Sequence, residues 1–434
     1  MRNMTMRIIG GLTCLPLLLQ TACTGLLDVK LPGKVTTETL NNPLNANVIT
    51  TGVVVDFECA WSNYVTAANA LSDQMVNASS QGVSQSWYTR NILSNDASLL
   101  GSCDVVAGLQ PYATLQTARV DADRALTMLT GFSDATVTNK PTLKATVRAY
   151  GAYATLALGE GFCEAVLTTG QVQPATAALT AAEAAFTDAL ALASAANNTD
   201  LGNMARVGRA RVRLDLGNFA GASSDAALVP AGYVKNASRG TGERQRWNLQ
   251  FELQNNAGSS VNRMGSVAPN WRAVTWGGVA DPRVAVSAAA NGNGSDGITP
   301  FFSHAKALSR ADGVPIASYK EAQLIIAEAA ARSGDLVTAR AIINARHTAV
   351  NIPAYDAAGV ETQNQVIAQV IEERARELFL EGGHRYNDML RFRSSAFKIP
   401  FRGEVGSIHP NGVDHRNLSY GATTCIPLPV AEKS

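Results

Sequence analysis

The chain has 434 residues, of which 46% are hydrophobic and 16% are charged, so it carries enough apolar material for a large core and is not intrinsically disordered. Its 36 Lys and Arg residues nearly balance its 35 Asp and Glu residues. This near-neutral charge does not indicate nucleic acid or an acidic membrane surface as a partner. The length allows two or three domains, or one helical-repeat superhelix.

Residues 1–22 have the pattern of a signal peptide. Arg2 and Arg7 precede an apolar run from Ile8 to Leu19, which is too short to span a bilayer comfortably. We expect this segment to be removed. After it no stretch of 18 apolar residues occurs, so the mature protein is not expected to cross a membrane by itself.

The segment Leu19-Gln20-Thr21-Ala22-Cys23 resembles a lipobox, in which the cysteine becomes the acylated N-terminus after cleavage. Cys23 is therefore the predicted lipid attachment site. Acyl chains there would hold a soluble domain on a bilayer surface, because each buried methylene contributes about 0.8 kcal/mol. The alternative is a plainly secreted protein.

Four cysteines remain for the folded part of an exported protein, where disulfides persist: Cys59, Cys103, Cys163 and Cys425. Four cysteines allow three connectivities. We favour Cys59 with Cys103, which bracket one N-terminal segment, and Cys163 with Cys425, which would tie the tail to the body. Free buried thiols are the alternative. The sequence contains no CxxC or HExxH motif, so neither a metal site nor a cofactor is expected.

Helical periodicity and composition divide the mature chain into four parts. These are an N-terminal segment with an aromatic loop region (23–110), alanine-rich helices (111–229), an irregular insertion (230–315) and a C-terminal helical region (316–434). Residues 205–222 read as a helix, a glycine turn and a second helix, and residues 319–347 repeat this pattern. We therefore predict an all-α, tetratricopeptide-like superhelix with long irregular insertions.

All five tryptophans lie in two zones without clear helical period, residues 51–102 and 230–315. Aromatic rings with polar neighbours are typical of sugar recognition, because the ring packs on the C–H face of a pyranose and the polar groups bind its hydroxyls. The candidate ligand-binding residues are Trp87, Tyr88, Asn270, Trp271, Arg272 and Trp276. Each could instead be a packing residue. Arg239, Arg244 and Arg246 beside Trp247 could contact an anionic ligand, with solvated loop charge as the alternative.

The C-terminal third contains the most specific text, Ile371-Glu372-Glu373-Arg374-Ala375-Arg376-Glu377-Leu378-Phe379-Leu380-Glu381-Gly382-Gly383-His384-Arg385-Tyr386-Asn387-Asp388-Met389-Leu390-Arg391. This segment resembles the SusD/RagB family, in which ER-x-x-E-L is followed by EG, R and D-x-x-R. Further matches are Leu27-Asp28, Asp281-Pro282-Arg283, Tyr319-Lys320-Glu321-Ala322 and Ile426-Pro427-Leu428-Pro429. The resemblance thus spans nearly the whole chain.

We interpret the charged residues of this motif as scaffold: Arg374, Glu377, Glu381, Gly382, Arg385, Asp388 and Arg391. Gly382 or Gly383 should end one helix in a left-handed conformation. Arg385, Asp388 and Arg391 should then share a face of the next helix and form ion pairs with Glu373 or Glu381. A carboxylate paired with a guanidinium stays ionised, which suits neither a general acid nor a nucleophile.

The resemblance implies a lipid-anchored protein of the outer membrane, exposed at the cell surface, which is not an enzyme and needs no cofactor. Its implied partner is a SusC-like TonB-dependent transporter, to which it delivers a captured nutrient, an oligosaccharide or in some members a peptide. The alternative is a tetratricopeptide scaffold lipoprotein of envelope assembly. A glycosidase would need two carboxylates across a cleft, and the sequence nominates no such pair.

Overall fold

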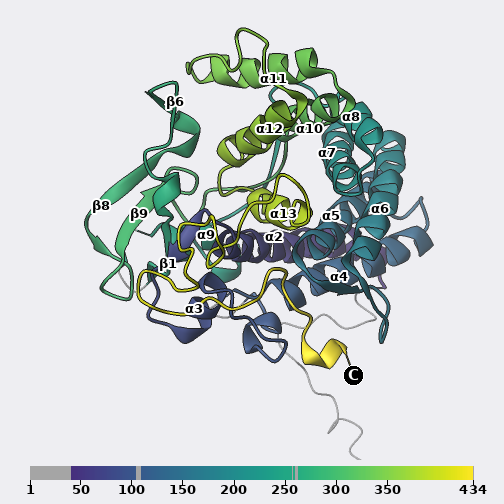
Figure 1. The fold of residues 1–434 in the computed structure, drawn as a ribbon. Coiled ribbons are helices and arrows are strands. Elements are labelled where there is room, and N and C mark those ends of the chain that lie inside the picture. Colours follow the sequence, from purple (N-terminus) through teal and green to yellow (C-terminus); the bar gives the residue numbers. More distant parts are fainter. Residues whose placement is uncertain (1–40, 104–108, 257, 260–261, 434) are drawn as a thin grey trace, which may run out of the picture.

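The computed structural model describes residues 41–103, 109–256, 258–259 and 262–433. Its helices follow one another in an arc, each packed on the next (Figure 1). The helices of the arc are α4 (Pro111–Gly131), α5 (Lys140–Gly161), α6 (Ala175–Ala195), α7 (Thr199–Asp215), α8 (Phe219–Ala226), α10 (Tyr319–Ser333), α11 (Leu336–Ala349) and α12 (Gln363–Glu377). The predicted all-α, tetratricopeptide-like superhelix is confirmed. No described helix is both long enough and apolar enough to span a bilayer.

The two helix–turn–helix units predicted at residues 205–222 and 319–347 are present in the structure. Gly217, between α7 and α8, has φ +78°, and Gly334, between α10 and α11, has φ +88°, a conformation that glycine adopts without strain. Asn218 and Asp335 then cap the second helix of each unit. Small residues let neighbouring helices approach closely: a Cβ on Gly208 would lie 2.3 Å from the Phe186 ring.

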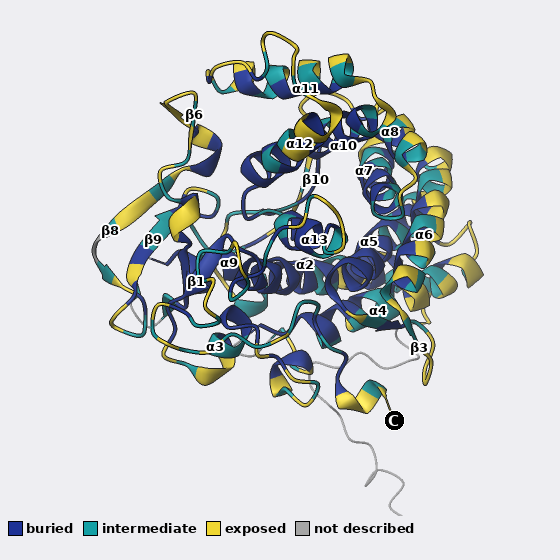
Figure 2. Cartoon of the chain, in the orientation of Figure 1, coloured by how far each residue is buried: buried dark blue, intermediate teal, exposed yellow. Residues whose placement is uncertain are grey.

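Residues 46–71 correct the expectation of an irregular zone over 51–102, because they form a single helix, α2 (Ala46–Leu71). This helix runs through the middle of the molecule and is buried along most of its length (Figure 2). A helix that is surrounded by other elements needs no polar face, so it lacks the amphipathic period by which a helix is recognised. Trp61 and Tyr64 of α2 belong to the main core.

The insertion of residues 230–315 connects α8 to α10, and these two helices pack on each other. It is built from short antiparallel pairs rather than from irregular loops alone. The pairs are β4 (Val234–Ala237) with β10 (Val314–Ser318), β1 (Met75–Asn77) with β5 (Gly265–Val267), β6 (Thr275–Trp276) with β7 (Val279–Ala280), and β8 (Val286–Asn293) with β9 (Pro300–His304). The short helices α3 (Gly82–Tyr88) and α9 (Leu249–Gln254) flank them, and β2 (Glu164–Val166) with β3 (Val172–Pro174) forms a hairpin beside α6.

The four cysteines are paired as the sequence analysis favours, Cys59 with Cys103 and Cys163 with Cys425. The second disulfide joins the end of α5 to the C-terminal tail across 262 positions. Next to it, the Cys163 amide donates to the Ile426 carbonyl at 3.0 Å, and the Ile426 amide donates to the Gly161 carbonyl at 2.9 Å. Covalent and backbone bonds thus fix the tail on the helical body.

Candidate functional site

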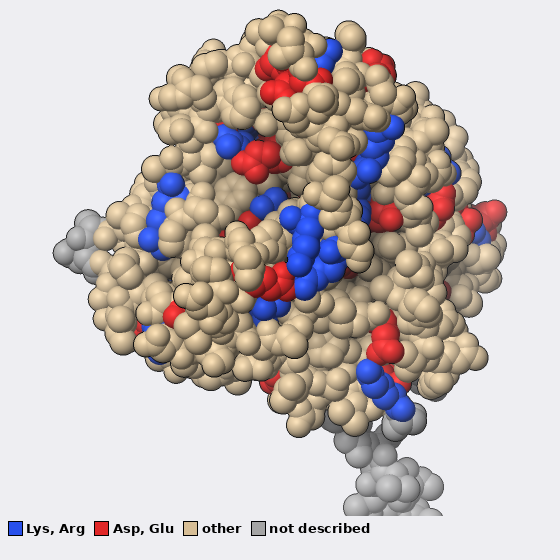
Figure 3. Space-filling model, in the orientation of Figure 1, with Lys and Arg blue, Asp and Glu red and all other residues tan. Residues whose placement is uncertain are grey.

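The C-terminal motif forms a buried ionic network at the junction of α10, α12 and α13 (His384–Arg391). Glu328 of α10 has no exposed surface and accepts hydrogen bonds from Arg374, Arg391 and Arg332. Asp388 completes the network, with Arg374 Nη1 at 3.0 Å and Arg391 Nη2 at 2.7 Å. Other charged side chains are exposed near the centre of the face shown in Figure 3, in the region of α12 and α13.

A second cluster connects the insertion to α12 through Asp281-Pro282-Arg283. Arg283 binds both oxygens of Asp281, at 2.9 and 2.7 Å, and Glu373 at 2.6 Å. The other oxygen of Glu373 contacts His347 Nε2 at 2.8 Å. Two of the matched segments are therefore joined in space as one buried ion cluster.

The partners of the motif residues differ from those expected. Arg385 binds Asp73 at 2.6 and 2.8 Å, and Glu381 binds Lys306 at 2.7 Å. Asp388 and Arg391 pair with each other and with the groups named above, not with Glu373 or Glu381. The expectation was wrong because these partners come from segments far away in sequence, which helical spacing alone does not identify.

The two glycines after α12 adopt left-handed conformations, φ +56° at Gly382 and φ +73° at Gly383. Their placement differs in detail from the expected helix end: α12 ends at Glu377, and Gly383 is the N-cap of α13. The Gly382 carbonyl accepts a hydrogen bond from Arg211 Nη2 at 2.6 Å. Arg211 also binds both oxygens of Glu160, at 2.5 and 2.6 Å.

The pKa values of these carboxyl groups follow from their partners. Burial alone would raise the pKa of Glu328, but the Arg391 and Arg374 guanidinium groups outweigh it and hold the pKa well below its ordinary value. The pKa of Glu373 is also lowered, because the hydrogen bond from His347 and the charge of Arg283 outweigh burial. A carboxylate held ionised in this way is a poor general acid, which supports the interpretation as scaffold.

Glu160 and Glu321 behave in the opposite way. Burial raises the pKa of Glu160 well above its ordinary value although Arg211 opposes the shift, and a second carboxyl group, Asp215, raises it further. Burial likewise raises the pKa of Glu321 to about 7, against the opposing charge of Arg211. The pKa values of these two carboxyl groups are therefore raised, in contrast to those of Glu328 and Glu373.

Three of the six predicted ligand-binding residues are core residues. Trp87, Tyr88 and Trp271 retain 0%, 1% and 3% of their surface. Trp87 Nε1 donates to Ser98 at 3.2 Å, and Tyr88 accepts from Gln254 Nε2 at 3.1 Å. The prediction that these rings present a face to a ligand is wrong for this structure, because packing takes up both faces of each ring.

The other three candidates reach the surface in the segment that connects β5 to β7. Asn270 is exposed, and the Arg272 guanidinium lies 3.8 Å from the centre of the Phe302 ring. Trp276 is half-buried, with its ring 5.0 Å from that of His347 and 5.7 Å from the Arg376 guanidinium. These three residues are the part of the predicted site that stays available to a ligand.

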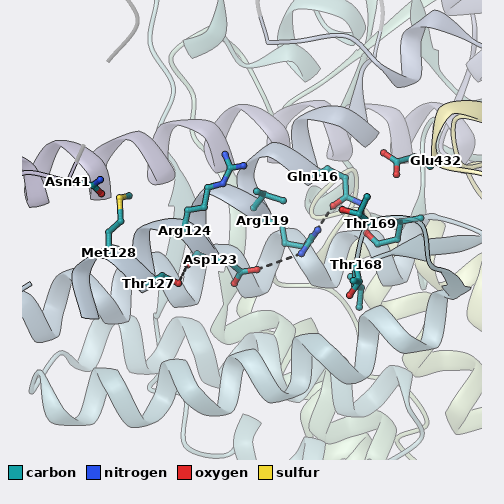
Figure 4. A pocket seen from close by; sticks show the side chains of 13 residues that line it. Asn41, Gln116, Arg119, Asp123, Arg124, Thr127, Met128, Thr168, Thr169 and Glu432 are labelled. Atoms are coloured by element: carbon teal, nitrogen blue, oxygen red, sulfur yellow. Dashed lines mark hydrogen bonds and ion pairs between the residues drawn. The ribbon is translucent and has the colours of Figure 1, made fainter. Parts of the chain in front are cut away.

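A groove of about 1100 Å³ lies elsewhere, along α4 and beside the β2–β3 hairpin. Polar side chains dominate it, and Arg119 and Asp123 face each other within it (Figure 4). Asn41 and Glu432 both line it, so the described chain begins and ends at this groove. It contains none of the predicted ligand-binding residues.

The sequence analysis did not predict a smaller pocket, of about 470 Å³, beside Trp247. It lies between the start of α9 and the loop before β10, with Phe251 and Arg310 among its lining residues. In the sequence, this site is indicated by Arg239, Arg244 and Arg246, which lie near Trp247. Arg310 also belongs to the site, but it is too far from Trp247 in the sequence for this pattern to include it.

The repeat helices and the buried ion pairs define a helical-repeat protein in which buried charges join distant segments of the chain. Residues 310–418 match the model of the SusD family. A SusD superfamily protein from Bacteroides vulgatus has the same fold, with a TM-score of 0.65 and 12% identity over 90% of this chain and 96% of that one. Together these findings confirm the SusD/RagB resemblance.

Two other similar structures are named as carbohydrate-binding or glycan-binding proteins. A SusD-like carbohydrate binding protein from Bacteroides vulgatus gives a TM-score of 0.56 at 13% identity, over 81% of this chain and 84% of that one. The surface glycan-binding protein A from Bacteroides uniformis gives 0.61 at 13% identity, over 89% of this chain and 97% of that one. Among curated proteins, none matches the sequence.

Proposed function

We propose that this protein is a cell-surface nutrient-binding lipoprotein that captures an oligosaccharide and delivers it to a SusC-like TonB-dependent transporter. The observation that carries the proposal is the SusD family pattern in residues 310–418, within a chain that shares the SusD superfamily fold over most of its length. A peptide is the second ligand class that the family resemblance allows.

Binding without catalysis is supported by the chemistry of the buried charges. Glu328, Glu373 and Asp281 are each paired with guanidinium groups, so none has a free oxygen for proton transfer to a substrate. Recognition in this proposal belongs to the surface of the insertion, where Arg272, Trp276 and Asn270 combine aromatic and hydrogen-bonding groups.

The proposed anchor, Cys23, lies outside the described residues. The 18 residues from Cys23 to Leu40 can extend at most about 60 Å, so the anchor would hold Asn41, at the α4 groove, within this distance of the membrane. We expect Cys23→Ser to move the protein from the membrane fraction to the soluble fraction. Cys14→Ser, within the segment expected to be removed, should leave it in the membrane fraction. Full retention of Cys23→Ser in membranes stripped of partner proteins would contradict the lipid anchor.

The test of the whole proposal is the identity of the membrane partner. A C-terminally tagged protein, extracted in detergent, is expected to co-purify with a large TonB-dependent barrel, identified by mass spectrometry. Recovery of envelope-assembly factors without such a barrel would refute the capture role and favour the tetratricopeptide scaffold alternative.

A further inference from the structure

The pocket beside Trp247 has the features of a built binding site. Its volume of about 470 Å³ lies within the range typical of small-molecule sites. The lining combines an aromatic ring, an aliphatic side chain, a glycine and five hydrogen-bonding side chains: Phe251, Leu308, Gly258, Thr241, Asn256, Ser259, Ser309 and Arg310. This mixture of an apolar surface with convergent polar groups suits a saccharide ring.

Arg310 is held in a single orientation at the edge of this pocket. Its Nε and Nη2 atoms bind the two oxygens of Glu252 at 2.7 and 2.9 Å. Its guanidinium plane lies 3.7 Å from the centre of the Trp247 ring. Among the described residues, Nη1 of Arg310 has no hydrogen-bond partner, so it remains a fixed, charged donor for a ligand.

The loop that carries Arg310 is also fixed. The Asn248 amide donates to the Arg310 carbonyl at 2.9 Å, and Asn248 Nδ2 donates to the Asp312 carbonyl at 2.8 Å. The Asp312 carboxylate accepts from the Leu308 amide and the Ser309 hydroxyl, both at 2.6 Å. Asp312 therefore uses its charge to shape the turn, and the pocket is pre-organised without a ligand.

Several arginines and carboxylates lie around this pocket. Glu252 acts on both Arg310 and Arg244. On the neighbouring side, Glu58 pairs with Arg246 at 2.7 Å and Arg239 at 3.8 Å. Arg310 therefore belongs to a cluster of guanidinium groups and carboxylates within the insertion and at its contact with α2.

The pKa values of two of these arginines are lowered, chiefly by burial. Burial lowers the pKa of Arg239 to about 10, with Glu58 opposing the shift and Arg246 adding to it. Burial also lowers the pKa of Arg244, with Glu252 opposing the shift and Arg310 adding to it. An anion bound nearby would favour the charged form of both groups.

We infer that the Trp247 pocket binds an acidic saccharide, with the Phe251 ring and Leu308 against the C–H face of the sugar and Arg310 Nη1 on its anionic substituent. This inference rests on the proposed function and names the class of nutrient. A carboxylate of a uronic acid and a sulfate ester share the required chemistry.

Leu308 offers a clean test because its side chain is 66% exposed, so its replacement should not disturb the core. Leu308→Asp places a like charge beside the ligand anion, and Leu308→Asn is its uncharged control of similar shape. Leu228→Asp, at a 63% exposed leucine after α8, controls for the charge added elsewhere on the protein. Folding of each variant is checked by thermal unfolding.

Isothermal titration calorimetry of the mature protein should use oligogalacturonate, sulfated carrageenan oligosaccharides and neutral maltooligosaccharides. We expect at least one acidic probe to bind, with affinity lowered at least tenfold by Leu308→Asp and less than threefold by Leu308→Asn or Leu228→Asp. The affinity should also weaken as salt rises. The acidic probe that binds identifies carboxylate or sulfate as the anion.

Binding of the neutral probe alone, or acidic binding that ignores Leu308→Asp, would overturn the inference and leave the capture role intact. Failure of both acidic probes to bind would also overturn it. The capture role itself is judged separately, by the co-purified barrel.

Discussion

Glu328→Gln is the most direct test of the scaffold role of the motif. The substitution keeps the size of the side chain but replaces a buried carboxylate that accepts hydrogen bonds from Arg374, Arg391 and Arg332. Asp388 would then be the remaining carboxylate for both Arg374 and Arg391. Removal of one partner of a buried ion pair costs about 3–5 kcal/mol, so we expect a loss of this size in the free energy of unfolding.

The measurement is urea unfolding of the mature protein, followed by far-ultraviolet circular dichroism and tryptophan fluorescence. Coincidence of the two transitions is needed before a free energy is assigned to a chain of this length. The matched control is Glu372→Gln, which removes a 2.8 Å pair with Arg376 from a glutamate that is 38% exposed. That exposed pair should contribute less than about 1 kcal/mol.

The effect of Glu328→Gln should also depend on pH. The folded-state pKa of Glu328 lies below its ordinary value of 4.5. Its contribution to stability is therefore complete above pH 4.5 and is lost as the pH falls through the folded-state pKa. A loss below 1 kcal/mol at pH 7, or a difference from wild type that does not shrink at acid pH, would refute this account of the network.

Three further predictions concern other parts of the fold. Because burial raises the pKa of Glu321 to about 7, wild-type stability should fall relative to Glu321→Gln as pH rises from 4.5 to about 7, by about 3 kcal/mol in total, measured by urea unfolding at a series of pH values. An unchanged difference would contradict the raised pKa. Replacement of Cys163 and Cys425 together by serine should cost about 2–5 kcal/mol, and a smaller loss in denaturant unfolding would mean that backbone bonds alone hold the tail. Trp87→Ala should lower stability by about 3–5 kcal/mol, since the ring is fully buried, and should leave ligand affinity unchanged in calorimetry. A stable variant that loses affinity would restore Trp87 as a ligand contact.

The sequence predicts the repeat helices well because local signals agree there. In residues 205–222 an alanine-rich helix, a glycine that adopts φ +78° and a capping asparagine all indicate the same helix–turn–helix unit. Over α2 these signals are missing. Its side chains are buried on nearly every side, so no polar face reveals the helical period, and only the folded context selects the helix.

The candidate site was harder to predict because one residue type serves two purposes. A tryptophan in a polar segment can stack on a sugar or fill the core, and Trp271 and Trp276 are five positions apart with different outcomes. Trp271 packs on Phe379 beneath the surface, whereas Trp276 reaches the surface of a two-residue hairpin. Trp271 ends a three-residue 3-10 helix and Trp276 ends a two-residue strand, and elements this short show no periodicity in the sequence from which the buried side could be predicted.

The motif joins segments that are far apart in the sequence. Its residues hold different segments: Glu373 binds Arg283 of the insertion, Arg385 binds Asp73 after α2, and the Gly382 carbonyl binds Arg211 of the repeat helices. Loss of any one would leave a buried charge without its partner, at a cost comparable to a large part of the stability of a folded domain.

The residues of the Trp247 pocket are under no such constraint. Their ion pair, Arg310 with Glu252, is contained within the insertion, so changes at positions 241, 251 and 308 would alter the ligand without disturbing the junction. The ion pairs at α12 and α13 stabilise the fold, whereas the pocket is formed by other residues, within the insertion. The pocket residues can therefore change without loss of those ion pairs. On this argument, exchange of the pocket residues at positions 241, 251, 308 and 309 between related chains should transfer ligand preference while the unfolding midpoint stays close to that of wild type. A chimaera that folds but keeps its original preference would show that recognition lies elsewhere on the surface.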